Sequence, residues 1–154
     1  MDVLIIEDND IKFSLIEECL REIDLRIQLR RAASYQSGIE ALVERECPCV
    51  ILDMTLPVFD AMHSLVGMDV LTFGGELILR ESARKRIDAK FIILSQYDTF
   101  VRGEKEVTFE QLRLELLAKY PKMVLGCVRL DSTSVSWKTE LCALIESTHE
   151  DFGR

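Results

Sequence analysis

The sequence predicts an α/β fold in which a doubly wound parallel sheet is flanked by helices. Three short apolar runs each end in a polar or acidic residue. They cover residues 3–6, 49–52 and 91–94, and they end in Glu7, Asp53 and Ser95. Runs of this length and composition are typical of parallel strands that are buried on both faces. Segments with helical periodicity separate the runs, which favours alternating β/α units.

In the first half of the chain, apolar periodicity predicts three strands and two helices. The strands are expected at residues 2–7, 25–32 and 49–53, and the helices at 10–23 and 36–46. The first helix has apolar residues at helical spacing, so we expect them to face the core. They are Ile11, Leu15, Ile16, Cys19, Leu20 and Ile23. Residues 25–32 alternate apolar and polar side chains, which indicates a strand near a sheet edge.

The second half of the chain continues the same alternation. Helices are expected at residues 75–86, 108–120 and 133–148, and strands at 90–95 and 123–130. Thr108 is the expected N-cap of its helix, with Gln111 completing a capping box. Trp137, Leu141, Leu144 and Ile145 form the expected buried face of the final helix. Together these elements make five β/α units.

Composition narrows the class of protein. A chain of 154 residues fits one domain with a substantial core. A net charge of −8 argues against a nucleic-acid surface, which needs a basic footprint. We find no apolar run long enough to cross a membrane and no secretory signal. The five cysteines lack the spacing of a zinc site, so we expect reduced thiols and a cytoplasmic protein.

The ends of the apolar runs predict a shared site. The carboxyl ends of parallel strands meet at one edge of a sheet, where sites are built in open α/β folds. Glu7, Asp8, Asp53 and Ser95 would therefore form an oxygen-rich pocket that suits a hard divalent cation. Each residue alone also has an ordinary structural reading, as a helix-capping turn, a loop aspartate or a strand-end serine. The agreement of position and order favours the site.

This arrangement resembles the receiver domain of two-component response regulators over nearly the whole chain. In that family an acidic pair after the first strand holds Mg²⁺, and an aspartate that ends the third strand accepts a phosphoryl group. A serine or threonine that ends the fourth strand hydrogen-bonds to this group. The resemblance places these roles on Glu7 and Asp8, on Asp53 and on Ser95. It also makes the backbone carbonyl of Thr55 a metal ligand, beside Glu7, Asp8 and Asp53.

The resemblance further implies a flavodoxin-like strand order, 2-1-3-4-5, and a place in phosphorelay signal transduction. Pro57, four residues after Asp53, matches the family pattern. Mg²⁺ is the implied cofactor, and a histidine kinase or phosphotransfer protein is the implied phosphodonor. The downstream partner is an unidentified protein, and a homodimer is an open alternative. We expect a stand-alone signalling module that acts by protein–protein contact rather than an enzyme.

One departure from the family lies at the end of the fifth strand. The family has a lysine there, followed by a proline, and the lysine pairs with the phosphoryl group. This chain has Leu130 and Asp131 at those positions. Arg129 is the nearest substitute, but neighbouring residues of a strand point to opposite faces, so its use requires a one-residue shift or a bulge.

Two connections also differ from the family. Residues 58–74 replace a short loop, and a long apolar connection of this kind is usually functional or packs back on the domain. Residues 96–108 differ in length and composition, on the side where receivers commonly dock partners. We expect residues 1–154 to form one receiver-like domain that carries both changes.

Two other functions are compatible with parts of the pattern. The first is a degenerate receiver that serves as a phosphorylation-independent dimerisation or scaffold module, which the missing lysine favours. The second is a haloacid dehalogenase-type phosphatase, whose nucleophile motif resembles Asp53-Met54-Thr55. That chemistry needs an acid/base at the place of Thr55, and a threonine cannot serve.

Overall fold

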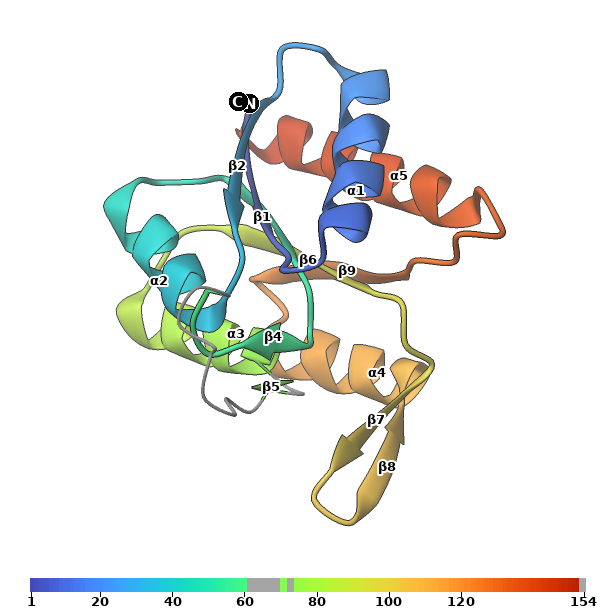
Figure 1. Cartoon of the computed structure of the whole chain (residues 1–154). Helices are drawn as coiled ribbons and strands as arrows, with labels where there is room; N and C mark the ends of the chain where they lie inside the picture. Colours follow the sequence, from blue (N-terminus) through green and yellow to red (C-terminus); the bar gives the residue numbers. More distant parts are fainter. Residues whose placement is uncertain (61–69, 72–73, 153–154) are drawn as a thin grey trace.

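The computed structural model describes residues 1–60, 70–71 and 74–152. Its centre is a five-stranded sheet with the order β2-β1-β3-β6-β9, in which every neighbouring pair is parallel (Figure 1). The strands are β1 (Asp2–Ile6), β2 (Gln28–Ala32), β3 (Cys49–Leu52), β6 (Lys90–Ser95) and β9 (Val124–Arg129). Since β6 and β9 are the fourth and fifth strands of this sheet along the chain, the predicted doubly wound fold and its 2-1-3-4-5 order are confirmed.

Helices cover both faces of the sheet. On one face lie α1 (Asp10–Ile23) and α5 (Ser136–Phe152), and on the other lie α2 (Tyr35–Glu44), α3 (Gly74–Lys85) and α4 (Phe109–Lys119) (Figure 1). Alternate residues of a strand point to opposite faces, so the core has two layers. Val3 and Ile5 pack in the layer of α1 and α5, whereas Leu4 and Ile6 pack in the other layer.

Local signals in the sequence explain most element boundaries. The capping box of α4 is present, because the Thr108 side chain accepts from Gln111 N–H and the Gln111 side chain accepts from Thr108 N–H. The prediction for the second strand was wrong at residues 25–27. There the Asp24 carboxylate accepts from the backbone N–H of Arg26 at 2.8 Å, and Ile27 N–H donates to the Asp24 carbonyl. These bonds form a turn, so β2 begins at Gln28.

The altered connection after β6 forms a hairpin that the sequence analysis did not predict. Strands β7 (Thr99–Arg102) and β8 (Lys105–Thr108) are antiparallel, and they project past α4 (Figure 1). Gly103, at the turn, has a φ of 64°, a conformation that glycine adopts without steric strain. Phe100 and Val107 face each other across the hairpin and are both buried, which ties its base to the core.

The long connection after β3 begins and ends in a second antiparallel pair, β4 (Leu56–Pro57) with β5 (Val70–Leu71). Most of the predicted 58–74 insertion lies outside the described residues. At its end, Gly75 approaches the site closely, since its N–H donates to the Met54 carbonyl at 3.0 Å. A Cβ atom at Gly75 would lie 2.5 Å from the backbone oxygen of Asp53, so only glycine fits without displacing α3.

All five cysteines are free thiols in the structure, and Cys19, Cys47 and Cys49 are buried. Within the described part of the chain, no helix combines the length and apolar character needed to cross a membrane.

Candidate functional site

Three carboxylates meet at the carboxyl edge of the sheet. Glu7 and Asp8 follow β1, and Asp53 follows β3 directly beside it. One oxygen from each lies within 4.8 Å of the others. Glu7 and Asp53 are buried, with exposed fractions of 1% and 4%, whereas Asp8 is exposed. The structure therefore brings together the acidic residues that the sequence analysis singled out.

A lysine that the sequence analysis missed completes this cluster. The Lys12 ammonium, in the first turn of α1, lies 2.7 Å from Glu7 Oε2 and 3.2 Å from Asp53 Oδ1. Lys12 is 4% exposed, although lysine is rarely buried unless it is paired. It is thus an internal counter-ion that bridges the ends of β1 and β3.

The helical periodicity of residues 10–23 gave no indication that Lys12 is buried. Ile11 was expected on the buried face of α1, and that expectation was wrong, since Ile11 is 75% exposed. The first turn instead directs Lys12 toward the carboxylates. Asn9 fixes this orientation, because it caps α1 by accepting from Lys12 N–H at 2.9 Å, while its own N–H donates to Glu7 Oε1 at 3.0 Å. The available signal was a lysine four residues after Asp8, one helical turn beyond the acidic pair.

Burial and mutual repulsion perturb the acids of this cluster. Burial, together with the charge of Asp53, raises the pKa of Glu7 from 4.5 to about 7 even though Lys12 acts to lower it. Burial also raises the pKa of Asp53, against the opposing effect of Lys12. For Lys12, burial lowers the pKa, but Asp53 and Glu7 more than offset this and the pKa is raised. Lys12 therefore stays charged, and the cluster as a whole remains short of positive charge.

The cluster fits a divalent cation. Glu7 Oε2 and Asp53 Oδ1 are buried, and among the described residues neither accepts a hydrogen bond from a neutral donor. Both lie close to the Lys12 ammonium, at 2.7 and 3.2 Å, which compensates only part of their charge. Buried carboxylate oxygens with unused acceptor capacity are the donors that Mg²⁺ takes. Glu7, Asp8 and Asp53 have the ligand chemistry that this ion requires.

Arg31 holds the acidic loop from the neighbouring strand β2. Its guanidinium donates to the backbone oxygen of Glu7 at 3.1 Å and of Asp8 at 3.2 Å, and it pairs with Asp10 at 2.8 Å. The same group lies 4.4 Å from the centre of the Phe13 ring. These contacts fix the loop that carries two of the three carboxylates.

Ser95 and Thr55 lie beside Asp53 along the chain and the sheet, at the end of β6 and in the loop after β3. Ser95 ends β6 and is fully buried, and its hydroxyl accepts from Tyr97 N–H at 3.3 Å. The backbone of Thr55 hydrogen-bonds to the Asp53 side chain, which acts to lower the pKa of Asp53. The bond orients the carboxylate from the loop that follows β3.

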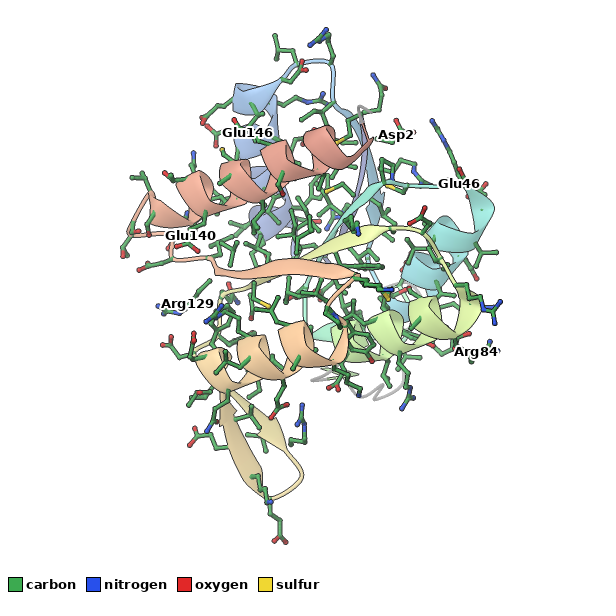
Figure 2. The ribbon with its side chains drawn as sticks, turned by 180° about the vertical axis from the view of Figure 1, so that it is seen from behind. Asp2, Glu46, Arg84, Arg129, Glu140 and Glu146 are labelled. Atoms are coloured by element: carbon green, nitrogen blue, oxygen red, sulfur yellow. The ribbon has the colours of Figure 1, made fainter. Side chains whose placement is uncertain are left out.

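Arg129 is directed away from the carboxylates. It pairs with Asp98 before the hairpin, and its side chain is 42% exposed. Figure 2 shows Arg129 at the outer edge of the molecule, beside the end of β9. The register of β9 against β6 does shift, but at Phe91/Ile92, far from this end of the strand. Leu130 is buried in the core layer of α1 and α5, so β9 brings no buried cation to the cluster.

The raised pKa of Glu7 predicts an unusual dependence of stability on pH. Since the folded protein binds this proton more tightly than the unfolded chain, the free energy of unfolding should fall as pH rises from 4.5 to about 7 in metal-free buffer. At about 1.4 kcal/mol per pKa unit, the contribution of Glu7 is at most about 3.5 kcal/mol. Urea titrations at several pH values would measure it. Glu7→Gln should remove this part of the slope, and an unchanged slope would contradict the assignment.

Comparison with known proteins gives the family. No protein-family model matches the chain. The chain is 30% identical over 151 residues to the Detocs response regulatory protein DtcB of Enterobacter cloacae, covering 92% of this chain and 95% of that protein. The chain belongs to the response regulator receiver family. An uncharacterised protein of Sinorhizobium fredii, y4jR, is 27% identical over 142 residues, covering 92% of this receiver and 94% of the relative.

Solved structures agree with this receiver in fold. A response regulator receiver domain from Clostridium thermocellum superposes with a TM-score of 0.61 at 18% identity, over 97% of this chain and 94% of the other. The response regulator TrrA from Thermotoga maritima, solved in complex with Mg²⁺-BeF, also gives 0.61 at 18% identity, over 96% and 97% of the two chains. At these identities the match concerns the fold alone.

Proposed function

We propose that this receiver accepts a phosphoryl group on Asp53 with Mg²⁺ and signals through protein–protein contact in a phosphorelay. The observation that carries the proposal is the position of Asp53. It is a buried carboxylate at the end of β3, with oxygens of Glu7 and Asp8 within 4.8 Å. Family membership, given by the relative DtcB, agrees with this role.

The chemistry uses Asp53 as a nucleophile. One carboxylate oxygen attacks phosphorus and forms the O–P bond of an acyl phosphate. With a phosphohistidine donor the P–N bond breaks, and the imidazole nitrogen keeps the electron pair and takes a proton from water. The chain mainly positions the reacting groups and neutralises charge. Thr55 orients the carboxylate, and Ser95, at the end of the adjacent strand β6, would hydrogen-bond to the phosphoryl group.

Glu7, Asp8, Asp53 and the carbonyl of Thr55 would hold Mg²⁺. The ion would offset the negative charge of the carboxylates and of the incoming phosphoryl group. The phosphodonor would be a histidine kinase or phosphotransfer protein, and the output an unidentified downstream protein.

Intact mass spectrometry tests the proposal. The purified protein is incubated with Mg²⁺ and a small-molecule acyl phosphate. We expect one added phosphoryl group on the wild type, and none without Mg²⁺ or in Asp53→Asn. Asp88→Asn, which removes an exposed aspartate just before β6, at the opposite edge of the sheet, should be phosphorylated like the wild type. An adduct that persists in Asp53→Asn would refute the assignment.

A phosphorylation-independent scaffold is the second candidate function. The observation that favours it is the end of β9, where Leu130 is buried and Arg129 pairs with Asp98. In that case the wild type would bind Mg²⁺ but form no adduct. Its oligomeric state, measured by sedimentation, would be the same in Asp53→Asn and after incubation with the phosphodonor.

A further inference from the structure

Among the described residues, the buried cation at the acidic cluster is Lys12, which comes from a helix and not from the end of a strand. At the end of β9, Leu130 is 5% exposed and packs in the core, and Arg129 pairs with Asp98. Lys12, from the first turn of α1, contacts Glu7 and Asp53 directly. The positive charge at this site therefore lies on the first helix, whereas the family pattern has it at the end of the fifth strand.

Lys12 is held in place rather than free to move into solvent. Its backbone N–H is bound by the Asn9 cap, and its side chain is 5% exposed. Its ammonium contacts Glu7 Oε2 and Asp53 Oδ1, which are both buried. An ammonium that is already desolvated and oriented interacts more strongly with a new anion than one that must first leave water.

Lys12 also lies between a surface pocket and Asp53. It lines a pocket of about 460 Å³ together with Asn9, Gln96, Tyr97 and Arg129. The same ammonium lies 3.2 Å from Asp53 Oδ1. A phosphoryl group that bonds to Asp53 would thus come within reach of Lys12.

The charge balance of the phosphorylated site favours a cationic side chain in addition to the metal ion. Glu7, Asp8 and an acyl phosphate on Asp53 would carry about four negative charges, because a phosphoryl group contributes up to about two. One Mg²⁺ ion offsets two of them. Lys12 would offset a third, at a place that the metal does not occupy.

We propose that Lys12 binds the phosphoryl group on Asp53 and so replaces the strand-five lysine of other receivers. This inference rests on the proposed function, since it assigns a role in the same reaction. On phosphorylation, the Lys12 ammonium exchanges its contact with Asp53 Oδ1 for contacts with phosphoryl oxygens. Lys12 is thus a phosphoryl-binding residue, and the residues that bind Mg²⁺ are separate from it.

The test compares Lys12→Gln, Lys12→Arg and the wild type by two measurements, the rate of adduct formation and the Mg²⁺ dissociation constant from calorimetry. Lys12→Gln should form the adduct at least about tenfold more slowly than the wild type. It should bind Mg²⁺ at least as tightly as the wild type. Lys12→Arg, which keeps the charge, should recover part of the rate. Lys138→Gln removes a lysine that pairs with Glu22 on the α1–α5 surface, and it should match the wild type.

The outcomes separate the two proposals. If the wild type forms no adduct, the proposed function fails. If the wild type forms it and Lys12→Gln forms it at the same rate, the role of Lys12 is overturned and the function stands. Loss of Mg²⁺ binding in a folded Lys12→Gln would also overturn it, because Lys12 would then only maintain the cluster.

A measurement on the wild type decides the case in which Lys12→Gln does not fold. The ¹⁵N resonance of the Lys12 ammonium should shift when Asp53 is phosphorylated, and that of Lys138 should not. An unchanged Lys12 resonance in a fully phosphorylated sample would overturn the proposal.

Discussion

Replacing Lys12 with methionine is expected to lower the free energy of unfolding by about 3–5 kcal/mol at pH 8 in metal-free buffer. The reason is that removal of one partner of a buried ion pair leaves the other charges buried without compensation. Glu7 and Asp53 are 2% and 4% exposed at their side chains, so water cannot replace the lost ammonium. Urea unfolding monitored by circular dichroism would measure the loss.

The pH and metal dependence of that loss identify its cause. At pH 5 the loss should be smaller, since Glu7, with a pKa of about 7, takes up a proton and no longer needs a counter-ion. Mg²⁺ should restore part of the stability at pH 8. Lys138→Met is the matched control for the loss of one positive charge, and it should change stability by less than about 1 kcal/mol. A Lys12→Met protein as stable as the wild type at pH 8 would contradict the ion pair.

Gly75→Ala is expected to disturb both the stability and the site. The new Cβ atom would lie 2.5 Å from the Asp53 backbone oxygen and 2.9 Å from Met54 Cα, and neither is a flexible side chain. The start of α3 must therefore move away from the end of β3, and the bond from Gly75 N–H to the Met54 carbonyl must lengthen or break. We expect a loss of about 1–3 kcal/mol in urea unfolding, with weaker Mg²⁺ binding in calorimetry.

Gly38→Ala is the matched control for this change. Its Cβ atom would lie 3.1 Å from side-chain methyl groups of Ile6 and Ile78, which can adjust by a few tenths of an ångström. We expect a smaller loss of stability and unchanged Mg²⁺ binding. Equal Mg²⁺ binding in Gly75→Ala and Gly38→Ala would show that the position of α3 does not affect the site.

The parts of the site that lie at strand ends could be predicted from the sequence. Glu7, Asp53 and Ser95 each follow a run that is apolar on both faces, so the strand and its end are marked by composition alone. Parallel pairing then places these ends at one edge, as the register of β1, β3 and β6 shows. The order of the strands was therefore enough to predict that Glu7, Asp53 and Ser95 lie at the same edge of the sheet.

The position of Lys12 could not be obtained in the same way. Helical periodicity treats a lysine as solvated, because burial of an ammonium is unfavourable unless carboxylates meet it in the folded protein. The carboxylates that do so come from two strands separated by more than forty residues. The error at Ile11 has the same origin, since the charge of its neighbour, rather than apolar area, sets the orientation of the first turn.

The β7–β8 hairpin is only weakly indicated by the sequence pattern. Phe100 and Val107 are the buried residues of two short alternating strands on either side of Gly103. Each strand has four residues, which is too short for alternation to stand out from a loop. The sequence indicated only a connection of unusual length and composition, because the form of the hairpin depends on the cross-strand pair.

The contacts of Arg31 should reduce the loss of conformational entropy that the proposed Mg²⁺ binding would entail. A loop that carries two ligands would normally lose conformational freedom when an ion binds, and that loss would weaken the affinity. Here the backbone oxygens of Glu7 and Asp8 are already bound by one guanidinium, which is itself fixed by Asp10 and the Phe13 ring. The ordering is completed when the protein folds, so binding should be fast and accompanied by little change in structure.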